Sequence, residues 1–520
     1  MLALTLCVNV SCCRTRRNSS FGWLNFLKRF WLFSNRLEQI TRQKIKSMSG
    51  FGMRKRIGRV ATVLVMLLWG SATVLAQEYI RNQESIPESV DQVVTPFELA
   101  FREKPKIPRF FPWLEEQLKD TPAFFRDTKL DLNVRSYYFD QDKSGDIKNV
   151  AWTLGGTLSY QSGWFLDRFS LGTVFYTSQK LYGPPDEDGT LLLKPGQESY
   201  AVVGEIYGKV KVFENNFINL YRYEGNTPFI NQNDNRMTPN TFEGYTFMGA
   251  YGGKDGAPGF NYGFGYIDKI KLRNSDTFIS MSEAAGADVN RGVFAEGGRV
   301  SYNDFTFGAI NYYSNDIINI FYTEATYKLF MTDRLGFLFA AQFTDQRSVG
   351  EDLLNGSAFE TNQFGIKADM SYRKGIFTIA YTRNSKGADL QSPWGGYPGY
   401  TSVQVENFKR AGENAFMAKL SYNFARFGLE SVAAYVLFTH GWGAVDPSTR
   451  NSVPNKNEFD ADIQWRPQWK FLKRLWFRVR YAYDHQYEAP KSTTNNFCVI
   501  VNYDLPLLSG DSKGLSSRTD

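Results

Sequence analysis

The sequence predicts an all-β fold, a transmembrane antiparallel β-barrel of about 18 strands with short turns at one rim and long loops at the other. Three observations predict it: segments that alternate apolar and polar side chains, connections that alternate short and long, and an aromatic content of 16% with 44 glycines. A mean hydropathy of −0.37 excludes a bundle of membrane helices, but it is compatible with a barrel in which every second residue faces water.

The alternation is clear at both ends of the predicted barrel. In the first segment, Leu130, Leu132 and Val134 alternate with a polar set, which is Lys129, Asp131, Asn133 and Arg135. In the penultimate segment, four apolar or aromatic residues alternate with Arg478, Arg480 and Asp484. Because a strand sends successive side chains to opposite faces, each segment has one apolar and one polar face. Such segments are too numerous for a two-sheet sandwich, and they favour a wall in lipid around a polar lumen.

The same pattern, bounded by turn residues, places all the strands. They are predicted at 128–138, 148–160, 168–178, 197–213, 217–223, 241–252, 258–271, 291–302, 305–313, 318–329, 334–345, 359–373, 375–385, 414–424, 427–440, 456–467, 473–486 and 494–503. Tight hairpins are expected at 214–216, 303–304, 373–375 and 425–426, whereas long polar loops are expected at 179–196, 224–240, 272–290, 346–358 and 386–413. The connection 314–317 is short where a long loop is due.

Five segments are expected along the chain. A basic start at Met53–Arg56, an apolar run and small residues before Gln77 predict a cleavable signal peptide over residues 53–76. We interpret residues 1–52 as an over-extended or untranslated gene start, the alternative being a membrane-surface segment at 21–33. Residues 77–127, with a short helix expected around Trp113–Lys119, form a periplasmic extension that is either a partial plug or a mobile terminus. The barrel is expected over 128–504 and a polar tail over 505–520.

The net charge of +7 is concentrated in the leader. Residues 1–76 carry 13 Lys and Arg against one acid, which leaves a net charge of −5 on the rest of the chain and gives no reason to expect nucleic acid as a partner. Cys498 is the only cysteine outside the leader, and the chain has two histidines. No disulfide framework, metal site or cofactor is therefore expected.

Basic residues on the polar faces are candidate anion ligands in the lumen. Arg478 and Arg480 lie two residues apart on a strand whose other face is aromatic, so both are expected to project inward. A guanidinium is permanently charged and its planar fork matches a carboxylate. Arg135, with Lys129, has the same position on the first strand. Alternatively, these arginines pair with lumenal acids such as Asp460, Asp462 or Asp484 and brace the wall, and both roles remain open.

Acidic residues are candidates for an opposing side of the pore. Glu324, Asp369 and Asp462 fall on polar faces, together with Lys367 and Lys419. Opposed rows of charge would set up a transverse field that orients dipolar solutes and favours one sign of ion.

No catalytic constellation is recognisable in the sequence. His440 and His485 lie near strand ends, and Thr439 points to the opposite face from His440, so the pair does not form a nucleophile with its base. The protein is therefore expected not to be an enzyme. Tyr397 and Tyr400 either line an entrance or pack within their loop.

Four stretches carry a resemblance to a known family. They read LYGPPDEDGTLLLKPGQESY (181–200), TPFINQNDNRMTPNTFEGY (227–245), GGYPGYTSVQVENFKRAGEN (395–414) and LWFRVRYAY (475–483). In order and spacing, over about residues 124–504, the chain resembles the OprD-type porins of Gram-negative outer membranes. Two features depart from that family: the long extension before the barrel, and a polar end where outer-membrane barrels usually finish on an aromatic residue.

The resemblance implies a monomeric, 18-stranded substrate-selective channel with short periplasmic turns, long extracellular loops and a basic ladder on its wall. It places residues 234–240 in the third, constricting loop and thus Arg236 at the narrowest point. Residues 395–414 would form the seventh loop on the other side of the constriction.

Together these features predict passive diffusion of small solutes, chiefly carboxylates, across the outer membrane. The expected partners are outer-membrane lipid and lipopolysaccharide, the barrel-assembly machinery, and small anionic or zwitterionic solutes. Two alternatives remain: a non-selective general diffusion porin, and an outer-membrane barrel hydrolase.

Overall fold

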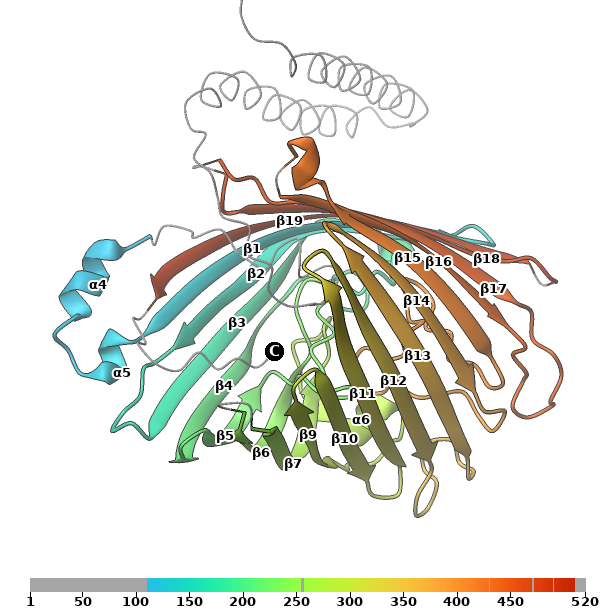
Figure 1. The fold of residues 1–520 in the computed structure, drawn as a ribbon, viewed down its shortest axis with the longest axis horizontal. Coiled ribbons are helices and arrows are strands. Elements are labelled where there is room, and N and C mark those ends of the chain that lie inside the picture. The colour runs from blue at the N-terminus through green and yellow to red at the C-terminus, as the bar shows by residue number, and fades with distance from the viewer. Residues whose placement is uncertain (1–109, 254–256, 430, 470–471, 490, 510–520) are drawn as a thin grey trace, which may run out of the picture. The chain divides into compact units, whose positions relative to one another are not determined.

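The computed structural model describes residues 110–509, apart from 254–256, 430, 470–471 and 490. The expectations for residues 1–52, for a signal peptide at 53–76, for residues 77–109 and for the tail from 510 lie outside the described residues. Before the barrel come α4 (Pro112–Leu118), where the sequence predicts a helix, and α5 (Ala123–Arg126). Figure 1 shows both helices beyond the ends of β1 and β2.

The barrel is a single antiparallel sheet closed on itself (Figure 1). Its strands are β1 (Lys129–Lys143), β2 (Ile147–Gln161), β3 (Phe169–Tyr182), β4 (Tyr200–Phe213), β5 (Asn216–Tyr223), β6 (Thr241–Gly252), β7 (Gly259–Lys271), β8 (Ile279–Ser280), β9 (Val293–Tyr302), β10 (Phe305–Ser314), β11 (Ile318–Thr332), β12 (Leu335–Arg347), β13 (Glu360–Tyr372), β14 (Gly375–Asn384), β15 (Asn414–Asn423), β16 (Val432–Trp442), β17 (Lys456–Trp465), β18 (Leu475–Gln486) and β19 (Ser492–Ser509). The two-residue β8 pairs only with the end of β7, and the other eighteen strands form the ring, which β1 closes by pairing with both β2 and β19. The predicted fold class is confirmed.

Burial along the strands alternates as the sequence predicts. On β14, Ile376, Thr378 and Ala380 are buried, whereas Phe377 and Ile379 between them are 41% and 40% exposed. The exposed set is apolar because it faces outward, where lipid rather than water covers it. Near Ala380 the inner face is covered by the long loop after β14, because Tyr400 and Val403 pack against the cluster that contains Ala380.

Hairpin turns at one rim are short, and two of them place asparagine at a left-handed position. Asn215 and Asn303 have φ of 58° and 50°, a conformation that asparagine tolerates better than most residues. Three strand ends also differ from expectation by five or six residues, and the first is the end of β1, which reaches Lys143 instead of 138. The connection near Ala425 and Arg426 is not a tight hairpin, because residues 424–427 form a 3₁₀ helix (η2, Phe424–Phe427) and β16 begins only at Val432. The last strand reaches Ser509, beyond its expected end at 503.

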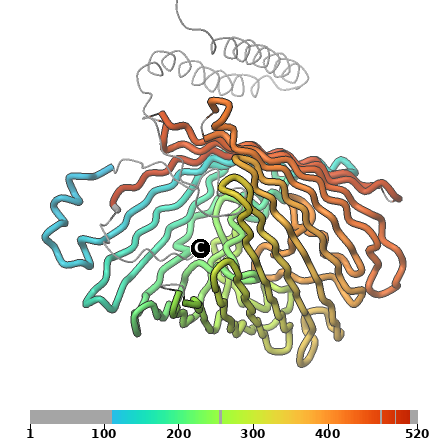
Figure 2. The backbone as a smooth tube through the Cα atoms, in the orientation of Figure 1, coloured from blue at the N-terminus to red at the C-terminus, as the bar shows by residue number. Residues whose placement is uncertain are grey.

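Four long connections, all at the other rim, are named here by their order: L2 (183–199), L3 (224–240), L4 (272–292) and L7 (385–413). L4 contains α6 (Met281–Ala285), and L2 contains the 3₁₀ helix η1 (Pro185–Glu187). Figure 2 shows green loop segments folded into the space that the strands enclose. Among the described residues, no helix combines the length and the apolar character needed to cross a bilayer.

A hydrophobic cluster ties three of these loops to the wall. Phe229 of L3, Met281 of L4 and Trp394 of L7 are fully buried in it, against Tyr312 of β10 and Ile320 of β11. The indole Nε1 of Trp394 also donates to the backbone oxygen of Met281, 2.8 Å away. Packing of this extent fixes the three loops relative to β9–β11, because closely packed side chains resist displacement.

Candidate pore constriction and charged wall

L3 reaches from one side of the barrel to the other. At Phe229 it packs on Tyr312 and Tyr322, with ring centroids 6.0 and 6.1 Å away, on β10 and β11. Five residues further on, Asp234 forms an ion pair with Arg135 of β1, which lies about half-way round the ring of strands. A chain can span at most roughly 3.6 Å per residue, so the segment between these points crosses the lumen by a short path.

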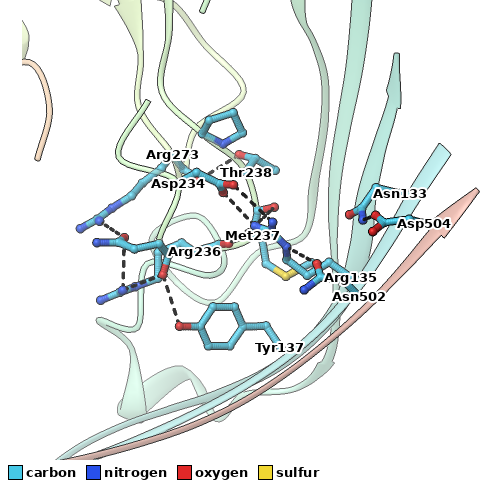
Figure 3. A network of polar contacts seen from close by, with 12 residues as sticks. Asn133, Arg135, Tyr137, Asp234, Arg236, Met237, Thr238, Arg273, Asn502 and Asp504 are labelled. Carbon is cyan, nitrogen blue, oxygen red and sulfur yellow. Dashed lines mark hydrogen bonds and ion pairs between the residues drawn. The ribbon is translucent and has the colours of Figure 1, made fainter. Parts of the chain in front are cut away.

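Arg135 holds the far end of this crossing (Figure 3). Its Nη1 donates to Asp234 Oδ1 at 2.8 Å and to the backbone oxygen of Arg236 at 2.7 Å, and its Nε donates to Asn502 Oδ1 at 2.8 Å. Tyr137, two residues along β1, donates to the backbone oxygen of Asn235 at 3.3 Å. The structure therefore places this predicted ladder residue in a brace between wall and loop.

Two further guanidinium groups meet at the tip of L3. Arg236 lies over the ring of Phe139, 4.8 Å from its centroid, and its Nε donates to the backbone oxygen of Thr190 at 2.8 Å. Arg236 and Arg273 of L4 both donate to the side-chain oxygen of Asn235. Figure 3 shows the two arginines converging on that amide. Burial, reinforced by Arg236, lowers the pKa of Arg273 to about 10, so the group is still charged at neutral pH.

Arg273 was not among the predicted site residues. It follows directly after β7, where the alternation of the strand has ended, so no periodic pattern marks its direction. The only signal in the sequence is its charge.

Arg478 and Arg480 lie on the lumenal face of β18 and share one carboxylate. Arg478 Nη2 is 2.8 Å and Arg480 Nε is 3.2 Å from Asp462 Oδ2. Arg480 pairs in register with Cys498 and Arg478 with Ile500 of β19, while Trp476 pairs with Asn502, the partner of Arg135. Arg480, Arg478 and Arg135 thus occupy three successive rows of the wall.

The remaining predicted residues are spread around the ring. Lys129 shares the face of Arg135 but is six residues away on β1, roughly 20 Å along an extended strand, and is exposed. Asp462 belongs to the row of the arginines that it neutralises rather than to an opposing one. Glu324 on β11 is across the ring, where it accepts a 2.6 Å hydrogen bond from Tyr400 of L7.

Asp369 is buried on β13, away from the arginine row. It accepts a hydrogen bond from Thr378, and Lys367 Nζ lies 3.8 Å from its carboxylate. Lys367 also lies 5.0 Å from the ring centroid of Tyr400. Lys419, on β15, lies 4.3 Å from that of Tyr435.

L3 and L7 meet beside an open cavity of about 670 Å³. Asn231 of L3 joins the loops: its Oδ1 accepts from Gly396 N at 2.8 Å, and its Nδ2 donates to Gly396 O at 3.0 Å. The lining includes Asn226, Thr227, Gln232, Asn233 and Pro398, and none of its residues is charged. Tyr397, also in the lining, has its ring largely buried against Phe229, so packing is its main role.

The histidines do not assemble a catalytic or metal site. His440 Nδ1 is 2.6 Å from Asn457 Oδ1 and its ring stacks on Trp442, while His485 stacks on Tyr483. Within the part of the chain that the structure describes, no group of three or more His, Cys, Asp or Glu side chains is arranged to hold a metal ion.

A closed eighteen-strand barrel with an apolar outer face and a lumen crossed by its own loops defines a channel of the outer-membrane porin class. The sequence model described as outer membrane porin, OprD family, matches residues 122–507. The chain belongs to the OprD family of outer-membrane porins.

Individual relatives agree with this assignment. The chain is 26% identical to Porin D of Pseudomonas aeruginosa strain PAO1 over 436 residues, which is 75% of this chain and 93% of the relative. It is similar in fold to Pseudomonas aeruginosa OccK9 (OpdG), with a TM-score of 0.67, 23% identity, and coverage of 74% of this chain and 100% of that one. Pseudomonas aeruginosa OpdK, in a crystal structure with vanillate, gives a TM-score of 0.64 at 19% identity, covering 74% of this chain and 99% of that one.

Proposed function

We propose that this porin passes small carboxylate-bearing solutes by selective passive diffusion, with the arginines of β18 and of the L3 tip forming a basic path through the constriction. The observation that carries the proposal is the sharing of one carboxylate, Asp462, by Arg478 and Arg480. Both guanidinium groups are permanently charged and lie on the lumenal face of β18, so they present positive charge to a solute in a confined space, where fields are strong. The relative OpdK, whose structure contains vanillate, supports a carboxylate as the solute class.

The path would continue at Arg236 and Arg273, which share a neutral amide oxygen, and no ion pair to either is seen among the described residues. Several modest anion sites in series suit conduction, because each must bind weakly enough to release the solute. Glu324, across the ring, would supply the opposite sign of charge. We further propose that the channel acts as a monomer and that residues 53–76 direct its export as a cleaved signal peptide.

Planar-bilayer recording tests the proposal. In a gradient of potassium chloride, the reversal potential of the wild type should show preference for chloride, and adding benzoate should reduce the chloride current by competition. The Arg478→Ala/Arg480→Ala double variant should lose most of both effects. A cation preference in the wild type, or a double variant that still responds to benzoate as the wild type does, contradicts the basic path.

The matched control removes two arginines that lie on the outer face of the barrel, Arg347→Ala and Arg383→Ala, both on the side away from the lumen. It changes the total charge equally and should leave the selectivity unchanged. Large currents that are indifferent to ion sign and to benzoate would instead identify a general diffusion porin.

A further inference from the structure

Two buried acidic residues of the barrel wall, Glu458 and Asp460, accept hydrogen bonds from the backbone of L7. The two carboxyl oxygens of Glu458 accept hydrogen bonds from Val405 N and Glu406 N, both at 2.7 Å. Asp460, two residues along the same face of β17, accepts from Gln404 N at 3.1 Å. Both acidic residues are 0% exposed. Three consecutive backbone N–H groups of the loop are thus satisfied by two side chains of the wall.

This contact is remote from the ends of the loop. L7 leaves β14 and returns to β15, whereas Glu458 lies on β17, two strands beyond β15. Side chains reinforce the contact, because Lys456 Nζ is 2.7 Å from Glu406 Oε1 and Gln404 Nε2 donates to Tyr481 O at 3.3 Å. Hairpin geometry alone would not bring residues 404–406 to this strand.

L7 crosses the lumen between two anchored points. Tyr400 donates its hydroxyl to Glu324 on β11, and four residues later Gln404 reaches Asp460 on β17, six strands further round the ring. The position of the crossing segment therefore depends on both anchors. On the β17 side, Glu458 makes two of the three backbone contacts.

We propose that Glu458 is a positioning residue that fixes the L7 side of the constriction and so keeps the pore at one stable aperture. This inference rests on the proposed function in one respect: it takes the lumen as the path of the solute. Glu458 is buried beneath the loop, so it acts on the aperture through L7. Both of its oxygens must reach two adjacent amide groups at once, which requires a carboxyl group at this chain length. A buried N–H group that loses its acceptor is destabilising. Loss of the Glu458 hydrogen bonds should therefore let residues 404–406 detach from the wall.

The test compares single-channel currents of the full-length porin in potassium chloride for three variants. Glu458→Gln keeps the length but leaves one acceptor oxygen, and Glu458→Asp keeps the carboxyl group but is one methylene shorter. Glu214→Gln is the matched control, since Glu214 is an exposed glutamate in the short turn between β4 and β5, at the rim opposite to L7. Heat-modifiable electrophoretic mobility confirms that each variant has formed its barrel.

Both Glu458 variants should spend roughly fivefold more time in detached-loop current levels than the wild type, and the control should behave as the wild type does. The aspartate variant should also keep the wild-type ion selectivity, because the charge of the wall is conserved. If only the glutamine variant spends more time in these levels, the charge of Glu458 and not the position of its carboxyl group controls the aperture, and the proposal fails. It also fails if neither variant changes or if the control changes equally. If the glutamine variant does not fold, the aspartate variant decides alone.

This outcome is independent of carboxylate transport. Current fluctuations in potassium chloride do not involve an organic solute, so a channel without carboxylate selectivity would still show the effect of Glu458. Conversely, loss of benzoate competition in the β18 arginine variants does not depend on the stability of L7.

Discussion

Arg135 on β1 forms a bidentate ion pair with Asp234 at the tip of L3, with Nη1 2.8 Å from Oδ1 and Nη2 3.3 Å from Oδ2. A fork-to-carboxylate contact of this kind sets orientation as well as distance. The same guanidinium also donates to the backbone oxygen of Arg236, so one wall residue holds both a side chain and the main chain of the loop. Arg135 therefore helps to fix the position of Arg236 at the tip of L3.

Replacing Asp234 with asparagine should loosen the tip of L3. The pair would lose its ionic component, worth about 1 kcal/mol for a partly exposed carboxylate, while the backbone contacts of Arg135 remain. Hydrogen exchange of the amides at 235–238 should accelerate by about fivefold. Asp186→Asn, at an exposed position in L2, is the control. Unchanged exchange in Asp234→Asn would mean that the backbone contacts alone hold the loop.

Asn231 should couple L3 to L7 through two separable hydrogen bonds. In Asn231→Asp the acceptor for Gly396 N remains but the donor to Gly396 O is lost, whereas Asn231→Ala removes both. Each neutral hydrogen bond contributes about 1 kcal/mol. The Gly396 amide should therefore stay protected from exchange in the aspartate variant and lose protection in the alanine variant. Equal protection in the two variants would show that the loops are held together elsewhere.

Trp394 should hold L7 against L4. In Trp394→Phe the hydrogen bond to Met281 O is lost at a cost of about 1 kcal/mol. In Trp394→Ala the loss of a fully buried indole should cost about 3–5 kcal/mol of local stability. Hydrogen exchange should rise in both L4 and L7, moderately in the phenylalanine variant and more strongly in the alanine variant. Trp113→Phe, at a 58% exposed position in α4, should have no such effect. A response confined to L7 would show that the cluster does not couple the loops.

The contact between L2 and L4 should be sensitive to acid. Lys194 Nζ lies 2.8 Å from Asp276 Oδ2, and this hydrogen bond holds the pKa of Asp276 below its usual value of 3.8. A lowered carboxyl pKa means that the contact stabilises the loops above the ordinary pKa and is lost as the pH falls through the lowered one. Carbon-13 NMR of the Asp276 carboxyl group should give a midpoint below 3.8, and Lys194→Met should raise it. An unchanged midpoint in that variant would exclude Lys194 as the cause.

The wall was predictable because its signal is local. The alternation around Arg478 and Arg480 fixes which side chains face the lumen, since a strand has a period of two and one face must meet lipid. All eighteen predicted strands are found, with shifts of a few residues at their ends. The three largest shifts are at the end of β1, after η2 and at the end of β19. The last two fall where a short helical turn and an unusually long last strand break the regular spacing.

The sequence by itself therefore determined the barrel and the inward direction of the β18 arginines, and through resemblance it predicted that L3 and L7 narrow the pore. Only the tertiary structure decided what those groups touch. It put Arg135 in a brace, gave Arg478 and Arg480 one shared carboxylate, brought Arg273 to the tip of L3 and placed Glu458 beneath L7. The physical reason is that loop contacts join residues far apart in the chain and depend on packing across the lumen, which no periodic pattern along the sequence encodes.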